Sequence, residues 1–249
     1  MGSDFDISGD FNQAFDGFPK LVMFDLDGTL VDSVPDLAVA TDAMLQELYG
    51  VSAGVEKVRL WVGNGASVLV RRALADVEAI AEAAVNDGQH QRALAQFLHY
   101  YRQASGQYSR LYPGAAAALA RLRRSQVTLA LVTNKPAEFV PHLLDDLGIA
   151  KDFKYWLGGD SLTEKKPHPA PLLELLKRSG VQASQALMVG DSRSDIEAAK
   201  AAKVASLGVS YGYNHGKPIA EESPRWITSN LDEFFAAALA APMASLGAD

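Results

Sequence analysis

The chain has 249 residues, of which 48% are hydrophobic and 21% charged, so it can bury the core of one large domain or two small ones and is not a disordered chain. It contains no cysteine, which excludes disulfides, a thiol nucleophile and a cysteine-ligated zinc site. Acidic residues outnumber basic ones by 30 to 23, and the net charge of −7 argues against a nucleic-acid partner. A small anionic ligand stays open, because a pocket can be locally positive within an acidic protein.

The two ends carry no signal for targeting or membrane insertion. Residues 1–18 lack a basic stretch followed by an apolar one, and no apolar run approaches the roughly 18 residues of a membrane-spanning helix. We therefore expect a cytoplasmic protein, a monomer or homodimer, without a membrane partner. We also expect residues 1–18 to form a flexible arm or the remnant of a tag, and residues 236–249 to form a frayed tail.

Four short apolar runs have the composition of buried parallel strands. Helical patterns separate the later runs from one another. This alternation predicts an α/β fold, a doubly wound parallel sheet with helices on its faces. The predicted strands are Lys20–Phe24, Val127–Val132, Ala186–Val189 and Val204–Val209, and the helical patterns cover Ala115–Arg123, Pro171–Arg178 and Ser194–Lys203.

The stretch 35–110 interrupts this alternation, because its apolar residues recur at helical spacing and it contains no convincing strand. It predicts an inserted helical cap, with residues 19–34 and 111–235 forming the α/β core. Such an insertion must return to the sheet through a two-stranded hinge, which we place near Tyr112. Pro141 conflicts with a helical pattern over residues 137–147 and is expected to start, kink or split that helix.

The strongest chemical motif follows the first predicted strand. Asp25 and Asp27 stand two residues apart, which suits one carboxylate as a nucleophile and the other as a general acid and base. Gly28 lets the chain turn steeply away from the strand. A calcium-binding EF-hand loop is excluded, because Leu30 and Asp36 stand where that loop needs glycine and glutamate. An N-capping turn is the structural alternative.

Three further motifs fall at or beyond predicted strand ends. Thr133 and Asn134 could hold phosphate oxygens or simply cap a helix. Lys166, which directly precedes Pro167, could neutralise a phosphate or carboxylate, or be a solvated lysine before a helix. Asp191 suits a hard cation such as Mg²⁺, and Asp195 either joins it or acts as an ordinary first-turn acid.

In this order, the motifs resemble the four signature motifs of the haloacid dehalogenase-like (HAD) hydrolase superfamily, and the helical insertion resembles its C1-type cap. The resemblance spans residues 20–230. The motifs are Asp25–Leu30, Thr133, Lys166 and the pair Asp191 and Asp195.

The resemblance implies an aspartyl-phosphate mechanism. Asp25 would attack phosphorus, and Asp27 would protonate the leaving oxygen and later activate water. Mg²⁺ would be held by the carboxylates of Asp25 and Asp191 and by the backbone carbonyl of Asp27, with Asp195 orienting the metal shell. A small anionic phosphorylated metabolite is the implied substrate.

The same resemblance assigns the remaining motif residues to phosphate binding. Thr133 and Asn134 would bind phosphoryl oxygens, and Lys166 would pair with Asp25 and the phosphate. Asp27 favours a phosphatase over a dehalogenase, because a halide leaving group needs no acid. A phosphosugar mutase, which shares the aspartate pair, stays open, and a receiver-like signalling module is disfavoured by the cap.

Within the family, the cap sequence from Trp61 to Leu74 resembles that of the bacterial phosphoglycolate phosphatases. This likeness implies 2-phosphoglycolate as the substrate, with glycolate and phosphate as products. Gly63, Asn64 and Gly65 would then form a loop facing the substrate carboxylate, with Arg71, or its neighbour Arg72, close by. The structural alternative for this glycine pair is a turn between two helices.

Overall fold

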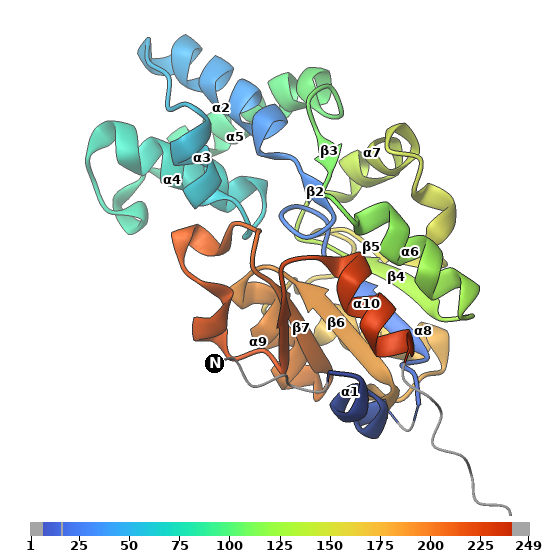
Figure 1. The fold of residues 1–249 in the computed structure, drawn as a ribbon. Coiled ribbons are helices and arrows are strands. Elements are labelled where there is room, and N and C mark those ends of the chain that lie inside the picture. The colour runs from blue at the N-terminus through green and yellow to red at the C-terminus, as the bar shows by residue number, and fades with distance from the viewer. Residues whose placement is uncertain (1–6, 16, 241–249) are drawn as a thin grey trace, which may run out of the picture.

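The computed structural model describes residues 7–15 and 17–240. A six-stranded parallel sheet in the order β5–β4–β1–β6–β7–β8 forms the centre of the molecule (Figure 1) and confirms the predicted α/β fold class. The strands are β1 Leu21–Phe24, β4 Thr128–Val132, β5 Tyr155–Leu157, β6 Ala186–Gly190, β7 Ala205–Val209 and β8 Trp226–Thr228.

Side chains alternate between the two faces of the sheet, as the pleat of a strand requires. Val22 and Phe24 of β1 belong to one buried cluster, whereas Leu21 and Met23 belong to the other. The first face packs against α1 Ile7–Phe15, α6 Ala115–Arg124, α7 Val140–Asp146 and α10 Leu231–Ala240. The second face packs against α8 Ala170–Ser179 and α9 Arg193–Ala202.

Two strands of the sheet, β5 and β8, were not predicted, because each has only three residues and is shorter than the apolar runs that indicate a strand. Their middle residues, Trp156 and Ile227, are exposed. Both strands lie at the edges of the sheet, where one side of the strand needs no partner.

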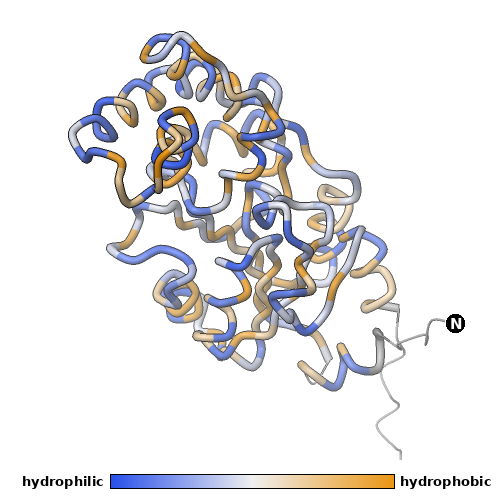
Figure 2. Tube along the Cα trace, turned by 90° about the vertical axis from the view of Figure 1, so that its left-hand side faces the viewer, coloured by the Kyte–Doolittle hydropathy of each residue, from blue (hydrophilic) through white to orange (hydrophobic). Residues whose placement is uncertain are grey.

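Four helices form the cap between β1 and β4. They are α2 Val34–Tyr49, α3 Val55–Trp61, α4 Ala66–Glu78 and α5 Asp87–Ala104. Their inward faces form a core of their own, which includes Met44, Leu74 and Phe97. Figure 2 shows this amphipathicity as hydrophobic and hydrophilic stretches that follow one another around the turns of the helices.

The cap is joined to the sheet by two short antiparallel strands, β2 Val31–Asp32 and β3 Arg110–Leu111 (Figure 1). The expected return point at Tyr112 directly follows β3, and its backbone N–H donates to the carbonyl of Leu30. Beside this hinge, the fully buried carboxylate of Asp36 accepts hydrogen bonds from three backbone N–H groups and one hydroxyl. The donors are the N–H groups of Gly106, Tyr108 and Ser109 and the hydroxyl of Ser109.

The expectation of a loose arm over residues 1–18 is wrong for Ile7–Phe15, which form α1. Phe11 is fully buried against Trp226 and Phe234, and Asp10 pairs with Arg225 at 3.0 Å. Apolar burial and this ion pair therefore hold the segment on the sheet. Residues 1–6 lie outside the described residues.

The boundary of the predicted tail at residue 236 is also wrong, since α10 extends to Ala240 and Ala238 is fully buried. Residues 241–249 lie outside the described residues.

Pro141 starts a helix, because it occupies the first turn of α7, where a missing N–H costs nothing. Short 3-10 helices complete the fold at Glu82–Ala84, Ala137–Phe139, Ala150–Asp152, Ala183–Gln185, Asn214–Gly216 and Ile219–Glu222. No helix within residues 7–15 and 17–240 has the length and apolar character needed to cross a membrane.

Candidate active site

The sheet brings the chemical motifs together at the carboxyl ends of three adjacent strands. β1 lies between β4 and β6, and the chain crosses to opposite sides of β1 to reach them. Asp25 follows β1, Thr133 follows β4, and Asp191 follows β6. This is the topological switch point at which open α/β sheets bind their ligands.

Lys166 lies at the centre of the charged cluster. Its Nζ is 3.0 Å from Oδ1 of Asp25 and 2.6 Å from Oδ1 of Asp195, and all three side chains are buried. Asp25 Oδ1 also accepts a hydrogen bond from the N–H of Leu26 at 2.7 Å. Lys166 comes from the loop after β5, so its predicted pairing with Asp25 is present in the structure.

Asp191 is held by two hydrogen bonds and by close packing. It accepts from the Thr29 hydroxyl and from the backbone N–H of Tyr213, both at 2.8 Å. Gly28 has φ +89°, and a Cβ there would lie 2.4 Å from Asp191 Oδ2. Glycine is therefore required both for the turn after β1 and for the approach of Asp191.

Burial raises the pKa of Asp25 well above its usual value, although the Lys166 ammonium acts in the opposite direction. Burial and the neighbouring Asp195 raise the pKa of Asp191 to about 7. Burial also opposes the charge on Lys166, but Asp195 and Asp25 outweigh it and raise the pKa of Lys166 above its usual value. The site thus contains one ammonium group that stays charged, and this group balances only part of the negative charge of the surrounding carboxylates.

The donor set fits a hard divalent cation. Carboxylate oxygens of Asp25, Asp191 and Asp195 all lie within 4.8 Å of one another, and Lys166 is their ammonium partner. Three carboxylates facing one ammonium favour a further cation with oxygen ligands, which Mg²⁺ prefers. Asp195 also accepts hydrogen bonds from the Ser192 N–H and hydroxyl, so its two oxygens already have partners and it mainly orients Lys166.

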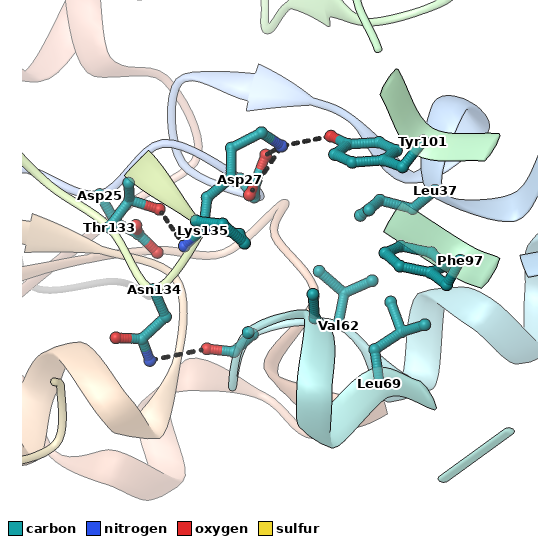
Figure 3. Close-up of a pocket in the computed structure, with 14 residues that line it drawn as sticks. Asp25, Asp27, Leu37, Val62, Leu69, Phe97, Tyr101, Thr133, Asn134 and Lys135 are labelled. Atoms are coloured by element: carbon teal, nitrogen blue, oxygen red, sulfur yellow. Dashed lines mark hydrogen bonds and ion pairs between the residues drawn. The ribbon is translucent and has the colours of Figure 1, made fainter. Parts of the chain in front are cut away.

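Asp27 points away from this cluster, toward a buried lysine that the sequence analysis did not single out (Figure 3). Nζ of Lys135 lies 3.0 Å from Oδ1 of Asp27, and it also donates to the hydroxyl of Tyr101 from cap helix α5. Burial opposes the charge on Lys135, yet Asp27 and Tyr101 raise the pKa of Lys135 above its usual value. Burial likewise raises the pKa of Tyr101, which keeps its hydroxyl neutral.

A cavity opens above Asp25 and Asp27, between the strand ends and the cap. The cap contributes Gly63 and Gly65, and the Asn134 side-chain amide donates to the Gly63 carbonyl at 3.2 Å (Figure 3). The lining residues are Asp25, Asp27, Leu37, Val62, Gly63, Gly65, Ala66, Leu69, Phe97, Tyr101, Thr133, Asn134, Lys135 and Pro136.

Two cap residues predicted to contact the substrate do not line this cavity. Arg71 pairs with Asp87 at 2.9 Å and donates to the Val85 carbonyl. Asn64 donates to Ser194 and accepts from Arg72, so its side chain joins the cap loop to the core. The helical pattern gave the spacing of Arg71 but could not tell which side of the helix faces the cavity.

Comparisons with known proteins agree with this geometry. A family model of haloacid dehalogenase-like hydrolases matches residues 22–209. The chain is 52% identical over 223 residues to a phosphoglycolate phosphatase of Pseudomonas syringae pv. tomato, covering 89% of this chain and 81% of the relative. It is 50% identical over 213 residues to phosphoglycolate phosphatase 1 of Pseudomonas aeruginosa, covering 86% of this chain and 77% of the relative.

Solved structures show the same likeness. The crystal structure of a predicted phosphoglycolate phosphatase from Haemophilus somnus 129pt matches with a TM-score of 0.81 and 39% identity, over 90% of this chain and 97% of that one. The family match includes the ends of β1, β4 and β6 with their aspartates and threonine. The chain therefore belongs to the haloacid dehalogenase-like hydrolases, as its motifs indicated.

Proposed function

We propose that this protein is a Mg²⁺-dependent phosphomonoesterase that converts 2-phosphoglycolate to glycolate and phosphate. The observation that carries the chemistry is the buried pair of Asp25 and Lys166, with Asp25 and Asp27 both lining a cavity between the strand ends and the cap. The substrate is inferred from relatives that share half of this sequence and are named phosphoglycolate phosphatases.

In the first step, a carboxylate oxygen of Asp25 attacks phosphorus, and the bond between phosphorus and the ester oxygen breaks. Asp27 donates its proton to that oxygen, which leaves as the hydroxyl of glycolate. In the second step, Asp27 takes a proton from water, and the water oxygen attacks phosphorus. Phosphate leaves and the Asp25 carboxylate is regenerated.

Electrostatics decides whether this attack is feasible. Two like charges 4 Å apart repel by about 1 kcal/mol in water and by about 4 kcal/mol at an effective dielectric of 20. Lys166, 3.0 Å from Asp25, offsets part of this repulsion between the carboxylate and the phosphate dianion. Its second contact, with Asp195, keeps the ammonium in place beside the Asp25 carboxylate.

Mg²⁺ would be held by the carboxylates of Asp25 and Asp191 and by the backbone carbonyl of Asp27, with Asp195 orienting the surroundings. When bound, the cation neutralises charge on the phosphoryl oxygens. The Thr133 hydroxyl and the backbone N–H of Asn134 remain to bind those oxygens, because the Asn134 side-chain amide donates to the carbonyls of Gly63 and Lys166.

The cap loop of Gly63 and Gly65 would close over the bound substrate and exclude water, which strengthens charge interactions in the site. Of the predicted cap contacts, these two glycines line the cavity and keep their proposed role. The cytoplasmic location and the monomeric or dimeric state stay predictions.

A panel of phosphomonoesters, with released phosphate as the readout, tests the proposal. We expect 2-phosphoglycolate to have one of the highest kcat/KM values, with turnover by the isolated protein and no partner. Preference for a phosphorylated sugar, or interconversion of sugar phosphates without phosphate release, would replace the substrate assignment with the phosphatase or mutase alternatives. Stable phosphorylation of Asp25 without turnover would indicate a signalling module.

A further inference from the structure

We propose that Lys135 and Tyr101 form the subsite that binds the carboxylate of the substrate, and so select a phosphorylated acid over a neutral phosphate ester. This inference rests on the proposed function, and it assigns to these two residues the task that the sequence analysis gave to the Gly63–Gly65 loop with Arg71 or Arg72 nearby.

The charge of the cavity wall provides the first argument. Lys135 is the one cationic side chain among the described residues that line the cavity, where Asp25 and Asp27 contribute negative charge. The cap side of the wall includes the apolar side chains of Leu37, Val62 and Phe97, and within the described part of the chain it contributes no cationic side chain. A dianionic phosphate with a carboxylate attached needs a positive partner for both ends.

The nearby arginines are already engaged elsewhere. Arg71 pairs with Asp87, and Arg72 donates to Asn64 and to the carbonyl of Trp61. Neither lines the cavity. Lys135, by contrast, lines the cavity beside Asp27.

The position of Lys135 fits the size of the ligand. Asp27, the proposed acid, must touch the ester oxygen of the substrate, and Lys135 Nζ lies 3.0 Å from Asp27. In 2-phosphoglycolate, a single carbon separates that ester oxygen from the carboxyl group. A carboxylate on so short a chain must land close to Asp27, and therefore within reach of the Lys135 ammonium.

Hydrogen-bonding groups converge on this point (Figure 3). The ammonium of Lys135 contacts both oxygens of the Asp27 carboxylate, at 3.0 and 3.3 Å, and the hydroxyl of Tyr101. Because the Tyr101 hydroxyl accepts from Lys135, it keeps its own proton to donate. A carboxylate with two oxygens can accept one bond from each.

Tyr101 also ties this subsite to the cap. It lies on α5 and stacks on Phe97, whereas Lys135 follows the β4 motif of the core. A ligand bridging the two would favour the arrangement in which cap and core are together. The reaction would then be gated by the presence of the acid group.

The test compares two substrates of equal chain length, 2-phosphoglycolate and 2-hydroxyethyl phosphate, in which an alcohol replaces the carboxylate. For Lys135→Met, we expect kcat/KM on 2-phosphoglycolate to fall about 10- to 100-fold more than on 2-hydroxyethyl phosphate, the effect of losing one charge-assisted contact. Tyr101→Phe should shift the same ratio by a smaller factor. Lys154→Met, which removes an equal charge from an exposed position just before β5, is the control and should leave the ratio unchanged.

Equal losses on both substrates would overturn the inference, because Lys135 would then act only by positioning Asp27. If the variants do not fold, the wild-type protein still decides: equal kcat/KM on the two esters overturns the subsite while the proposed function stands. A wild-type protein that hydrolyses other phosphate esters but not 2-phosphoglycolate would overturn the proposed function, and the subsite with it.

Discussion

The Lys166 ammonium lies 3.0 Å from the Asp25 carboxylate, and both side chains are buried at the carboxyl end of β1. A fixed ammonium beside one carboxylate oxygen leaves the other oxygen to act as a nucleophile. This pairing explains how an acidic protein can bring an anionic side chain to an anionic phosphate.

Asp25→Asn should abolish phosphate release, lowering kcat by several orders of magnitude, because an amide is a far weaker nucleophile than a carboxylate. The variant should still fold, since asparagine has nearly the same shape. Phosphate release and circular dichroism measure the two effects. Asp145→Asn, at an exposed position of α7, is the matched control. Full activity of Asp25→Asn would remove Asp25 from the mechanism.

Chelation of divalent cations should stop the reaction, and added Mg²⁺ should restore it, because the carboxylate cluster lacks positive charge. Binding to the native state should also raise the thermal midpoint, by the equivalent of about 2.7 kcal/mol when Mg²⁺ is 100 times its Kd. Asp191→Asn should lose this thermal shift. A protein indifferent to EDTA in both measurements would contradict the metal site.

Asp36→Ala should destabilise the protein by about 3 kcal/mol, because it leaves buried donors of the hinge segment without an acceptor. Urea unfolding measures this loss. Asp36→Asn keeps one acceptor oxygen and should lose less, and Asp145→Ala should stay within about 0.5 kcal/mol of the wild type. A neutral effect of Asp36→Ala would mean that water replaces the carboxylate.

Phe11→Ala should cost about 3–5 kcal/mol of stability, as expected when a buried aromatic ring is removed. Activity at low temperature should persist, because the ring packs against Trp226 and Phe234 rather than the cavity. Exposed Gln13→Ala on the same helix is the control for helix propensity. If both variants unfold at the same urea concentration, the packing of α1 contributes little.

His215 should make the protein sensitive to mild acid. Burial lowers the pKa of His215 below its usual 6.5 at a position where its ring contacts the Leu60 carbonyl and Arg72. As the pH falls below about 6.5, the unfolded chain gains a proton that the folded state resists, so stability declines. His215→Gln should flatten this part of the pH profile of the thermal midpoint, and exposed His142→Gln should not. Identical profiles for all three proteins would exclude this source of acid sensitivity.

The sequence alone predicted the site residues best where a chemically reactive side chain directly follows a strand. Asp25 and Asp191 follow continuous apolar runs, and the rules of parallel sheets bring such ends together. These rules could not orient side chains in loops. Lys135 stands two residues after Thr133, but only the path of the loop after β4 sends it to Asp27 rather than into solvent.

Tyr101 and α1 show a second limit. Tyr101 is part of an ordinary helical pattern, and its contact with Lys135 depends on how the cap is placed over the sheet. Phe11 lies in a short amphipathic segment whose partner, Trp226, stands near the other end of the chain. Periodicity describes one segment at a time, so contacts between distant segments stay invisible to it.

The antiparallel pairing of Val31 with Leu111 has a consequence for the history of such proteins. Because it sets the two crossing points of the insertion side by side, the intervening helices can be lengthened, shortened or replaced without re-routing the sheet. The cap can therefore change in evolution while the catalytic residues at the carboxyl ends of the sheet strands stay the same. A chimera carrying a relative's segment between these two strands would change the cap side of the cavity wall while retaining both the nucleophile Asp25 and the ammonium of Lys135.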